Sequence, residues 1–152
     1  MVDVRKALPV LVLCVIAVLV GGCNDTISDK DIEYIGLAQV KSAVDDKSGK
    51  TYLIDPRAPQ DFALGHIPGA SNLQLNKVSD RKDSLDPALS RYKLLIVYGQ
   101  APNSDVAKGM TKRLMRAGAK DVKMFSGGFL EWSRSGLPIE KSAPDAAAPA
   151  AR

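Results

Sequence analysis

The chain has 152 residues, enough for one domain with a substantial hydrophobic core and little more. Its composition is that of an ordinary globular protein, which excludes a wholly disordered or fibrous chain. The net charge of +4 is spread along the sequence, and no basic patch is interleaved with aromatic residues, so nothing supports nucleic-acid binding.

The first 22 residues have the pattern of an export signal. Arg5 and Lys6 form a positive segment, and residues 7–20 are apolar apart from a helix-breaking proline. That apolar run is shorter than the roughly 20 residues that a membrane-spanning helix needs. Residues 1–22 are therefore predicted to be a signal peptide that is removed from the mature protein.

Small residues directly precede Cys23, in the sequence Val-Gly-Gly-Cys that ends the signal. This pattern resembles the lipobox of bacterial lipoproteins, which implies that Cys23 carries lipid and becomes the new N-terminus. We expect an extracytoplasmic protein of the cell envelope, anchored to a bacterial membrane, inner or outer. Because Cys14 would leave with the signal peptide, the mature chain would keep no free thiol. The alternative is a secreted or otherwise anchored protein in which Cys23 is incidental.

Strand and helix patterns alternate along the rest of the chain, after a polar tether predicted for residues 23–32. Alternation of this kind favours an α/β fold with a mostly parallel sheet. A domain is predicted for residues 33–140, and the alanine- and proline-rich residues 141–152 are predicted to be a disordered tail. The expected elements are a strand at 34–35, a helix at 36–46, a strand at 51–54, a weak helix over 85–92, a strand at 94–98, a helix at 105–117, a strand at 122–125 and a short helix after 127–128.

The stretch from 93 to 120 predicts a strand, a short loop and a helix in direct succession. A continuous apolar run at 94–98 predicts a buried strand, and a turn composition follows it. Ser104 suits the N-cap of the next helix, and Gly118 suits its end. The free N–H groups of that helix would point into the loop and favour an anion there. The candidate ligand-binding loop is Gly99, Gln100, Ala101, Pro102, Asn103 and Ser104.

Three separated motifs resemble the rhodanese-like domain. A strand ends in Asp-Pro-Arg, the run Gly-His-Ile-Pro-Gly-Ala-Ser-Asn follows at 65–72, and Gly-Gly-Phe-Leu-Glu-Trp stands at 127–132. The closing Gly-Leu-Pro-Ile at 136–139 also fits that family. The resemblance covers residues 33–140 and implies a single domain with a sheet of about five strands and helices on both faces. The motif residues are Asp55, Arg57, Gly65, His66, Gly69, Gly127, Gly128 and Trp132.

These motif residues are expected to be structural. Just beyond a buried strand, Asp55 and Arg57 would form an internal ion pair, or the carboxylate would bond to the backbone, and either would fix the loop. Gly65 and Gly69 would provide turns with positive φ. His66 is the only histidine, and without a second histidine or a cysteine nearby we expect neither a metal site nor a catalytic role. Trp132, with the nearby Phe129, is predicted to pack in the core. We expect no cofactor.

Active members of the family that the chain resembles transfer sulfur through a cysteine directly after the central strand, which becomes a persulfide. Gly99 stands at that position here, and a Cys-x-Gly-Pro-x-Cys form of the loop would align with residues 99–104 and lacks both cysteines. Ser104 has a hydroxyl with too high a pKa and no visible base. No catalytic residue is therefore assigned, and Gly99 is expected to let a ligand approach the backbone closely.

Three functions remain open from the sequence. The first is a non-catalytic binding module that holds a small oxyanion, or an acidic group of an envelope protein partner, at residues 99–104. The second is a structural envelope lipoprotein with a vestigial loop. The third is an enzyme related to the thiosulfate and persulfide sulfurtransferases, with a degenerate site or a thiol supplied by a partner.

Overall fold

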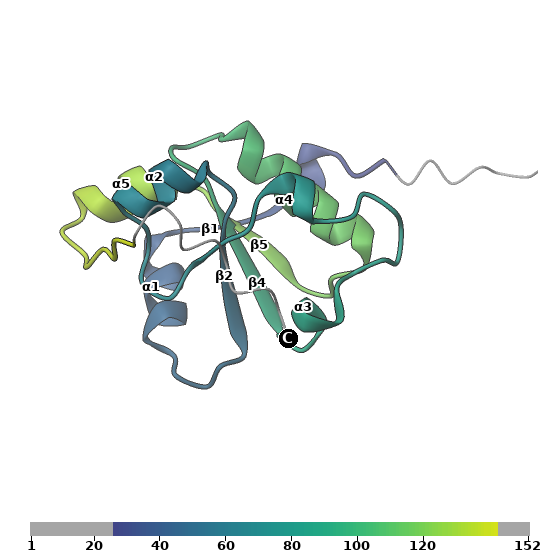
Figure 1. Ribbon diagram of the computed structural model, residues 1–152, viewed down its shortest axis with the longest axis horizontal. Coiled ribbons are helices and arrows are strands. Elements are labelled where there is room, and N and C mark those ends of the chain that lie inside the picture. Colours follow the sequence, from purple (N-terminus) through teal and green to yellow (C-terminus); the bar gives the residue numbers. More distant parts are fainter. Residues whose placement is uncertain (1–25, 143–152) are drawn as a thin grey trace, which may run out of the picture.

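The computed structural model describes residues 26–142 of the chain (Figure 1). The predicted signal peptide, Cys23 and residues 143–152 of the predicted tail lie outside this range. Within residues 26–142, no helix combines the length and the apolarity needed to cross a bilayer.

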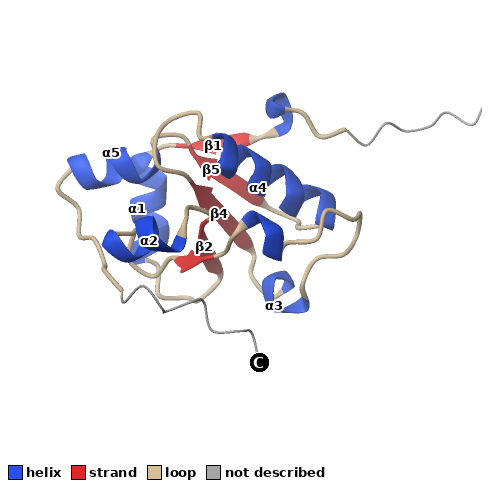
Figure 2. Ribbon diagram, turned by 45° about the horizontal axis from the view of Figure 1, so that its top comes forward, coloured by secondary structure: helices blue, strands red, loops and turns tan. Residues whose placement is uncertain are grey.

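Five parallel strands form one sheet at the centre of the domain (Figures 1 and 2). Their spatial order is β1-β5-β4-β2-β3, so the strand that comes fourth in sequence lies in the middle. The carboxyl ends of all five strands therefore meet at one edge of the sheet. The predicted α/β fold with about five strands is confirmed. The strands are β1 (Glu33–Ile35), β2 (Thr51–Asp55), β3 (Ser71–Asn72), β4 (Leu94–Tyr98) and β5 (Val122–Phe125).

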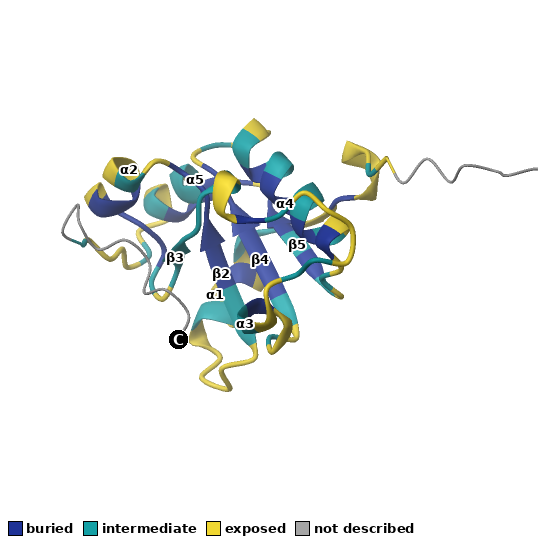
Figure 3. Cartoon of the chain, turned by 45° about the vertical axis from the view of Figure 1, so that its right-hand side comes forward, coloured by how far each residue is buried: buried dark blue, intermediate teal, exposed yellow. Residues whose placement is uncertain are grey.

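Helices cover both faces of the sheet. Because side chains alternate along a strand, Leu95 and Val97 of β4 face one core cluster, whereas Ile96 and Tyr98 face the other. The first cluster lies under α3 (Pro87–Ser90) and α4 (Asp105–Ala117), and the second lies under α1 (Leu37–Asp45) and α5 (Gly128–Arg134). The short helix α2 (Pro59–Leu64) lies beside α1 and α5 (Figure 2). Figure 3 shows that β2 and β4 are the most buried part of the sheet.

The helix that follows the candidate loop forms as its sequence predicts. α4 starts at Asp105 and ends at Ala117, and Gly118 closes it in the left-handed conformation with φ of 99°. Its buried face consists of Ala107, Met110, Thr111, Leu114 and Ala117, which recur at helical spacing. The N-terminus of this helix is thus fixed at the carboxyl edge of the sheet.

The weak helix predicted for residues 85–92 is much shorter in the structure. α3 spans only Pro87–Ser90, and its N-cap is Asp86, whose side chain accepts the N–H of Ala88 at 2.8 Å. Pro87 occupies the first turn of α3, and Asp86 before it has an extended ψ of 127°. A proline disfavours the helical conformation in the residue before it, so the helix starts at Pro87 and not at residue 85.

Residues 26–32, predicted to be part of a loose tether, pack against the domain instead. The 3-10 helix η1 (Asp29–Asp31) is capped by Ser28, whose hydroxyl accepts the N–H of Lys30 and whose own N–H donates to Asp31. Ile32 is only 5 % exposed and belongs to the core under α4. We call residues 26–32 the N-terminal strap.

Candidate functional site

The loop that follows β4 turns sharply at the carboxyl edge of the sheet. Gly99 is buried, and Pro102 and Asn103 occupy the centre of a turn, with Asn103 at a φ of 60°. Proline followed by a residue with positive φ is what a type II turn requires, and asparagine tolerates that conformation well. Within residues 26–142, no acceptor receives the N–H of Gln100, Ala101 or Asn103. These three N–H groups therefore have no protein partner within the described residues.

Ser104 stands at the N-cap position of α4, but its side chain makes no capping hydrogen bond. The predicted N-cap position of Ser104 is confirmed, although the hydroxyl does not bond to the first-turn N–H groups. The side chain instead fills the space beside Gly99, where a β-carbon on Gly99 would overlap both Oγ and Cβ of Ser104. The space of a side chain on Gly99 is thus filled by Ser104, whereas the close approach of a ligand to the Gly99 backbone stays a prediction.

Asp55 and Arg57 form a buried ion pair at the end of β2, as their spacing predicts. Arg57 Nε lies 3.0 Å from each carboxylate oxygen of Asp55, and Nη2 lies 2.7 Å from Oδ2. The backbone N–H of Arg57 also donates to Asp55 Oδ1 at 3.0 Å. Both side chains are almost inaccessible, at 0 % and 5 % exposure. A planar guanidinium suits this two-point contact, which fixes the start of the segment that leads to α2.

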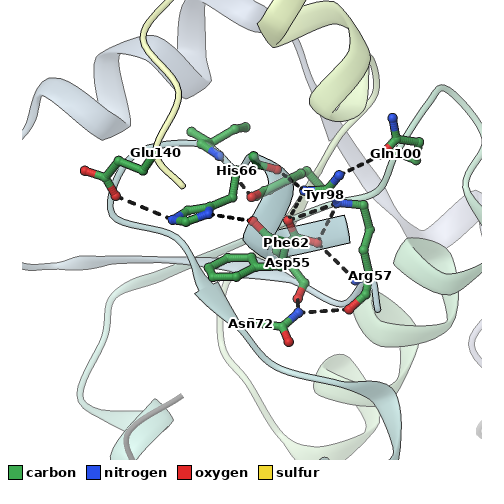
Figure 4. A network of polar contacts seen from close by, with 10 residues as sticks. Asp55, Arg57, Phe62, His66, Asn72, Tyr98, Gln100 and Glu140 are labelled. Carbon is green, nitrogen blue, oxygen red and sulfur yellow. Dashed lines mark hydrogen bonds and ion pairs between the residues drawn. The ribbon is translucent and has the colours of Figure 1, made fainter. Parts of the chain in front are cut away.

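Arg57 also connects three other parts of the site (Figure 4). Nη2 donates to the carbonyl of Gly65 at 2.7 Å, and Nη1 donates to Gln100 Oε1 at 2.6 Å. The guanidinium lies over the ring of Phe129, 4.5 Å from its centroid. Arg57 therefore ties the end of β2, the end of α2 and the candidate loop together.

Glycines admit close backbone contacts around the loop. A β-carbon on Gly128, which has a φ of 64°, would lie 2.7 Å from the carbonyl oxygen of Gly99. The approach allows Phe129 and Leu130 to donate their N–H groups to the carbonyls of Gly99 and Gln100, at 2.8 and 2.9 Å. The start of α5 thus binds the carbonyl groups of the loop, while the loop N–H groups stay free.

The remaining glycines of the motif differ in conformation. Gly69 has the predicted positive φ, at 75°. The same prediction for Gly65 is wrong, because its φ of 168° is extended. Gly65 packs closely instead, since a β-carbon there would lie 3.1 Å from the ring of Phe129. At Gly127, a β-carbon would overlap the side chain of Glu131.

His66 lies in a hydrogen-bonded seam with the end of the domain. Its Nδ1 is 2.9 Å from the carbonyl of Phe62, and its ring stacks on Phe62 with centroids 3.7 Å apart. Its backbone N–H and C=O pair with those of Glu140 at 2.9 and 3.0 Å. Glu140 Oε2 lies 3.6 Å from Nε2 and accepts the N–H of Gly69 at 3.0 Å (Figure 4). These contacts all join segments of the fold.

Two buried aromatic residues support the candidate site from the core. Trp132 is 1 % exposed and donates from Nε1 to the carbonyl of Pro138 at 2.7 Å. Tyr98, the last residue of β4, accepts the N–H of Ile67 at its hydroxyl, 3.2 Å away. Burial, together with the nearby Asp55 carboxylate, raises the pKa of Tyr98 well above its ordinary value of 10.0. Tyr98 is therefore neutral at physiological pH and links the loop to the segment after α2.

The surroundings of the loop are acidic at the surface. Asp105 begins α4, Glu131 lies on α5 and Asp61 lies on α2, and all three are exposed. A hollow of about 380 Å³ next to the first turn of α4 is lined by Pro56, Gln74, Leu75, Asn76, Val106 and Arg113. Among the described residues, no three histidine, cysteine or acidic side chains are grouped so as to hold a metal ion. Any anion at the loop would thus be held by backbone N–H groups.

The fold has counterparts among known proteins. Residues 37–135, well over half of the chain, match the family described as the rhodanese-like domain. The chain belongs to the rhodanese-like family. The resemblance seen in the three sequence motifs is thereby confirmed.

Curated relatives of this rhodanese-like chain are longer proteins. An HTH-type transcriptional regulator of Mycobacterium tuberculosis, Rv0324, is 30% identical over 98 residues, which are 64% of this chain and 41% of that protein. The thiosulfate sulfurtransferase YnjE of Escherichia coli is 32% identical over 101 residues, 57% of this chain and 22% of that protein. The chain thus spans less than half the length of these two relatives.

Solved structures share the rhodanese-like fold. The BH2092 protein of Bacillus halodurans superposes with a TM-score of 0.63 at 20% identity, covering 74% of this chain and 79% of the other. The rhodanese-like domain of the Alr3790 protein of Anabaena gives a TM-score of 0.57 at 24% identity, with 78% and 86% covered. At these identities the likeness concerns the fold alone.

The structure places the predicted loop and the Asp55–Arg57 pair side by side, joined by Gln100. Sequence reasoning included Gln100 in the loop but did not identify it as the partner of Arg57. The hydrogen bond joins residues 43 positions apart, so no local pattern signals it. Phe129 was expected only to pack in the core, whereas it also covers the guanidinium of Arg57.

Proposed function

We propose that this protein is a lipid-anchored rhodanese-like domain that binds a ligand at residues 99–104 and does not transfer sulfur. The observation that carries the proposal is the position of Ser104, whose side chain fills the space beside Gly99 where the side chain of a nucleophile would stand. Residues 26–142 contain no cysteine. A hydroxyl cannot replace a thiolate in this chemistry, because the nucleophile must be ionised near neutral pH and must carry a sulfane sulfur.

The free backbone donors of the loop support a binding role. The N–H groups of Gln100, Ala101 and Asn103 accompany the free first-turn N–H groups of α4, and together they favour an oxygen-rich anion. Arg57 is already neutralised by Asp55 and would act by holding Gln100 and thus the loop. The proposed ligand is a small oxyanion or a carboxylate of an envelope protein.

Binding is tested by thermal denaturation of the purified protein with thiosulfate, sulfate and phosphate. We expect at least one of these anions to raise the Tm of the wild type, because a ligand that binds only the folded state stabilises it. The gain should be retained in Lys41→Ala, which removes a charge of α1 remote from the loop. The binding role fails, and the loop is vestigial, if two results are found together. No anion raises Tm, and substitution of Asn103 or Ser104 leaves unchanged the amount of envelope protein that the domain captures.

Sulfur transfer is tested separately with a thiosulfate:cyanide assay on the same preparation. We expect no turnover above the uncatalysed rate. Turnover by the processed protein would overturn the proposal and favour an enzyme related to the sulfurtransferases.

The anchor is tested through Cys23. We expect the wild type to carry acyl mass on its N-terminal peptide and to partition into detergent, and Cys23→Ser to lose both. Unchanged partition of Cys23→Ser would contradict the proposed lipid anchor without bearing on the loop.

A further inference from the structure

The N-terminal strap makes a turn against α4. Thr26, Ile27 and Asp31 line a hollow of about 250 Å³ together with Met115 and Arg116, near the end of the helix. Between them, Asp29 lies 3.2 Å from Lys108 Nζ and 2.8 Å from Lys112 Nζ of α4. The strap therefore enters the domain at the C-terminal end of α4, reaches toward the middle of the helix at Asp29 and returns at Asp31.

Several contacts fix the path of the N-terminal strap. Ser28 N and Oγ donate to Asp31 Oδ2 at 2.7 and 2.8 Å, and Ile32 is inserted in the core. The hydrogen bonds from Lys112 and Lys108 lower the pKa of Asp29, so its carboxylate stays charged at neutral pH. The entry point of the chain is thus a defined place on the surface.

That entry point and the candidate loop lie at opposite ends of α4. The loop leads into Asp105, whereas Thr26 lies near Met115 and Arg116. A helix of this length, from Asp105 to Ala117, separates its two ends by about 20 Å at 1.5 Å per residue. Because α4 follows a parallel strand, its C-terminal end lies at the amino edge of the sheet, away from the carboxyl edge that bears the loop (Figure 1).

The chain between Thr26 and Cys23 is too short to carry Cys23 from one end of α4 to the other. Three residues in extended form span at most about 11 Å. A lipid on Cys23 would thus hold the C-terminal end of α4 close to the bilayer. Exposed cations are present at this end, namely Arg81, Lys82, Arg116 and Lys120, together with the acidic Asp80 and Asp83.

We infer that the domain stands on the bilayer on the C-terminal end of α4 and presents residues 99–104 to the aqueous phase. The inference rests on the proposed acylation of Cys23. It makes the phospholipid surface the partner of the amino edge of the sheet. The ligand of the loop then arrives from solution, as a dissolved anion or a soluble protein, and not as a headgroup of the same membrane.

The test places one fluorophore at either edge of the acylated, mature protein, from which Cys14 has been removed with the signal peptide. Acylation consumes the thiol of Cys23, so Lys120→Cys and Ala58→Cys each supply a single reactive thiol. Lys120 is exposed at the amino edge, and Ala58 is exposed just beyond β2 at the carboxyl edge. The labelled proteins are reconstituted in phosphatidylcholine and phosphatidylglycerol vesicles that contain a doxyl-labelled quencher lipid.

We expect quenching at position 120 to exceed quenching at position 58 several-fold. Inserting about ten glycine and serine residues before Thr26 gives a flexible tether with a reach of roughly 18 Å, and should reduce the difference while the protein stays on the vesicles. Equal quenching at the two positions in an acylated protein, or stronger quenching at position 58, would overturn the orientation. Absence of acyl mass on Cys23 would instead overturn the anchor, and the orientation with it.

Discussion

The hydroxymethyl group of Ser104 takes the place that a side chain on Gly99 would need. Both residues belong to the same loop, and the overlap involves Cβ as well as Oγ of Ser104. Rotation of the hydroxyl alone could not make room, because Cβ is fixed to the backbone. A side chain at position 99 and a side chain at position 104 therefore exclude each other in this loop conformation.

The variant Gly99→Cys tests this exclusion. We expect it to lose about 1–3 kcal/mol of unfolding free energy, as overpacked sites do. Gly99→Cys/Ser104→Gly should recover part of that loss, whereas Gly99→Cys/Ser104→Ala should not, since alanine keeps Cβ. Urea denaturation of the three variants, with Ser104→Gly as reference, measures the difference. Equal stability of the glycine and alanine double variants would contradict the steric account.

Arg57→Ala should be among the most destabilising single substitutions in the domain. It leaves the buried carboxylate of Asp55 without its partner, and breaking a buried pair in this way costs about 3–5 kcal/mol. Lys41→Ala removes one member of the exposed pair with Asp45 and should cost less than about 1 kcal/mol. Denaturant titration measures the free energy of unfolding of both variants. Similar losses in Arg57→Ala and Lys41→Ala would show that the buried Asp55–Arg57 pair stabilises the fold no more than an exposed ion pair.

Gln100→Leu should loosen the loop without unfolding the domain. The substitution removes the acceptor that Arg57 Nη1 contacts at 2.6 Å and with it the side-chain link between the loop and β2. We expect faster amide hydrogen exchange at Phe129 and Leu130, whose N–H groups donate to the loop carbonyls of Gly99 and Gln100, and little change in β4. Gln60→Leu, at an exposed glutamine of α2, is the matched control and should leave exchange at Phe129 and Leu130 unaltered. Unchanged exchange in Gln100→Leu would mean that α5 alone holds the loop.

Asp105→Asn should strengthen anion binding. The Asp105 carboxylate lies in the first turn of α4 and repels an anion held by the same N–H groups. Removing one such charge is worth about 0.3–1 kcal/mol, which corresponds to roughly two- to fivefold in Kd for sulfate or phosphate. The free protein should become slightly less stable, because the favourable interaction with the helix dipole is lost. Asp45→Asn, at the C-terminal end of α1, is the control and should change neither the Kd of the anion nor the stability of the free protein.

Alkaline pH should destabilise the protein through Tyr98. The folded state holds the Tyr98 proton above the ordinary pKa of 10.0, whereas the unfolded chain releases it near that value. The unfolded state therefore binds fewer protons above pH 10, so this contribution to stability is complete below pH 10 and declines as pH rises, by up to about 1.4 kcal/mol per pH unit. Tyr98→Phe should show a shallower decline, measured by urea denaturation between pH 8 and 11. An identical slope would exclude Tyr98 as its source.

The sequence predicts best the parts of this fold that rest on local patterns. Apolar runs locate β2 and β4, and the four-residue spacing from Val106 to Leu114 locates α4 with its closing Gly118. Sequence motifs also pair Asp55 with Arg57. These features depend on residues close together in the chain, so their physical cause is visible in the sequence itself.

Two of the errors have different physical causes. The helix predicted for residues 85–92 starts only at Pro87, because the residue before a proline is disfavoured in the helical conformation, and Asp86 has an extended ψ of 127°. Gly65 was expected to turn with positive φ, whereas its backbone is extended and it packs closely against the ring of Phe129, far along the chain. The first cause is local, whereas the second depends on packing that no short sequence window contains.

The position of β1 has a consequence for how the protein is assembled. Its register partners are all in β5, from Glu33 opposite Lys123 to Ile35 opposite Phe125. β1 is the first strand to be synthesised, but it has no partner strand until β5 has been made. Closing the long loop between β1 and β5 carries an entropic cost. Because such non-local pairing slows folding, we expect the domain to complete itself late and in one cooperative step, after nearly all of the chain has been made.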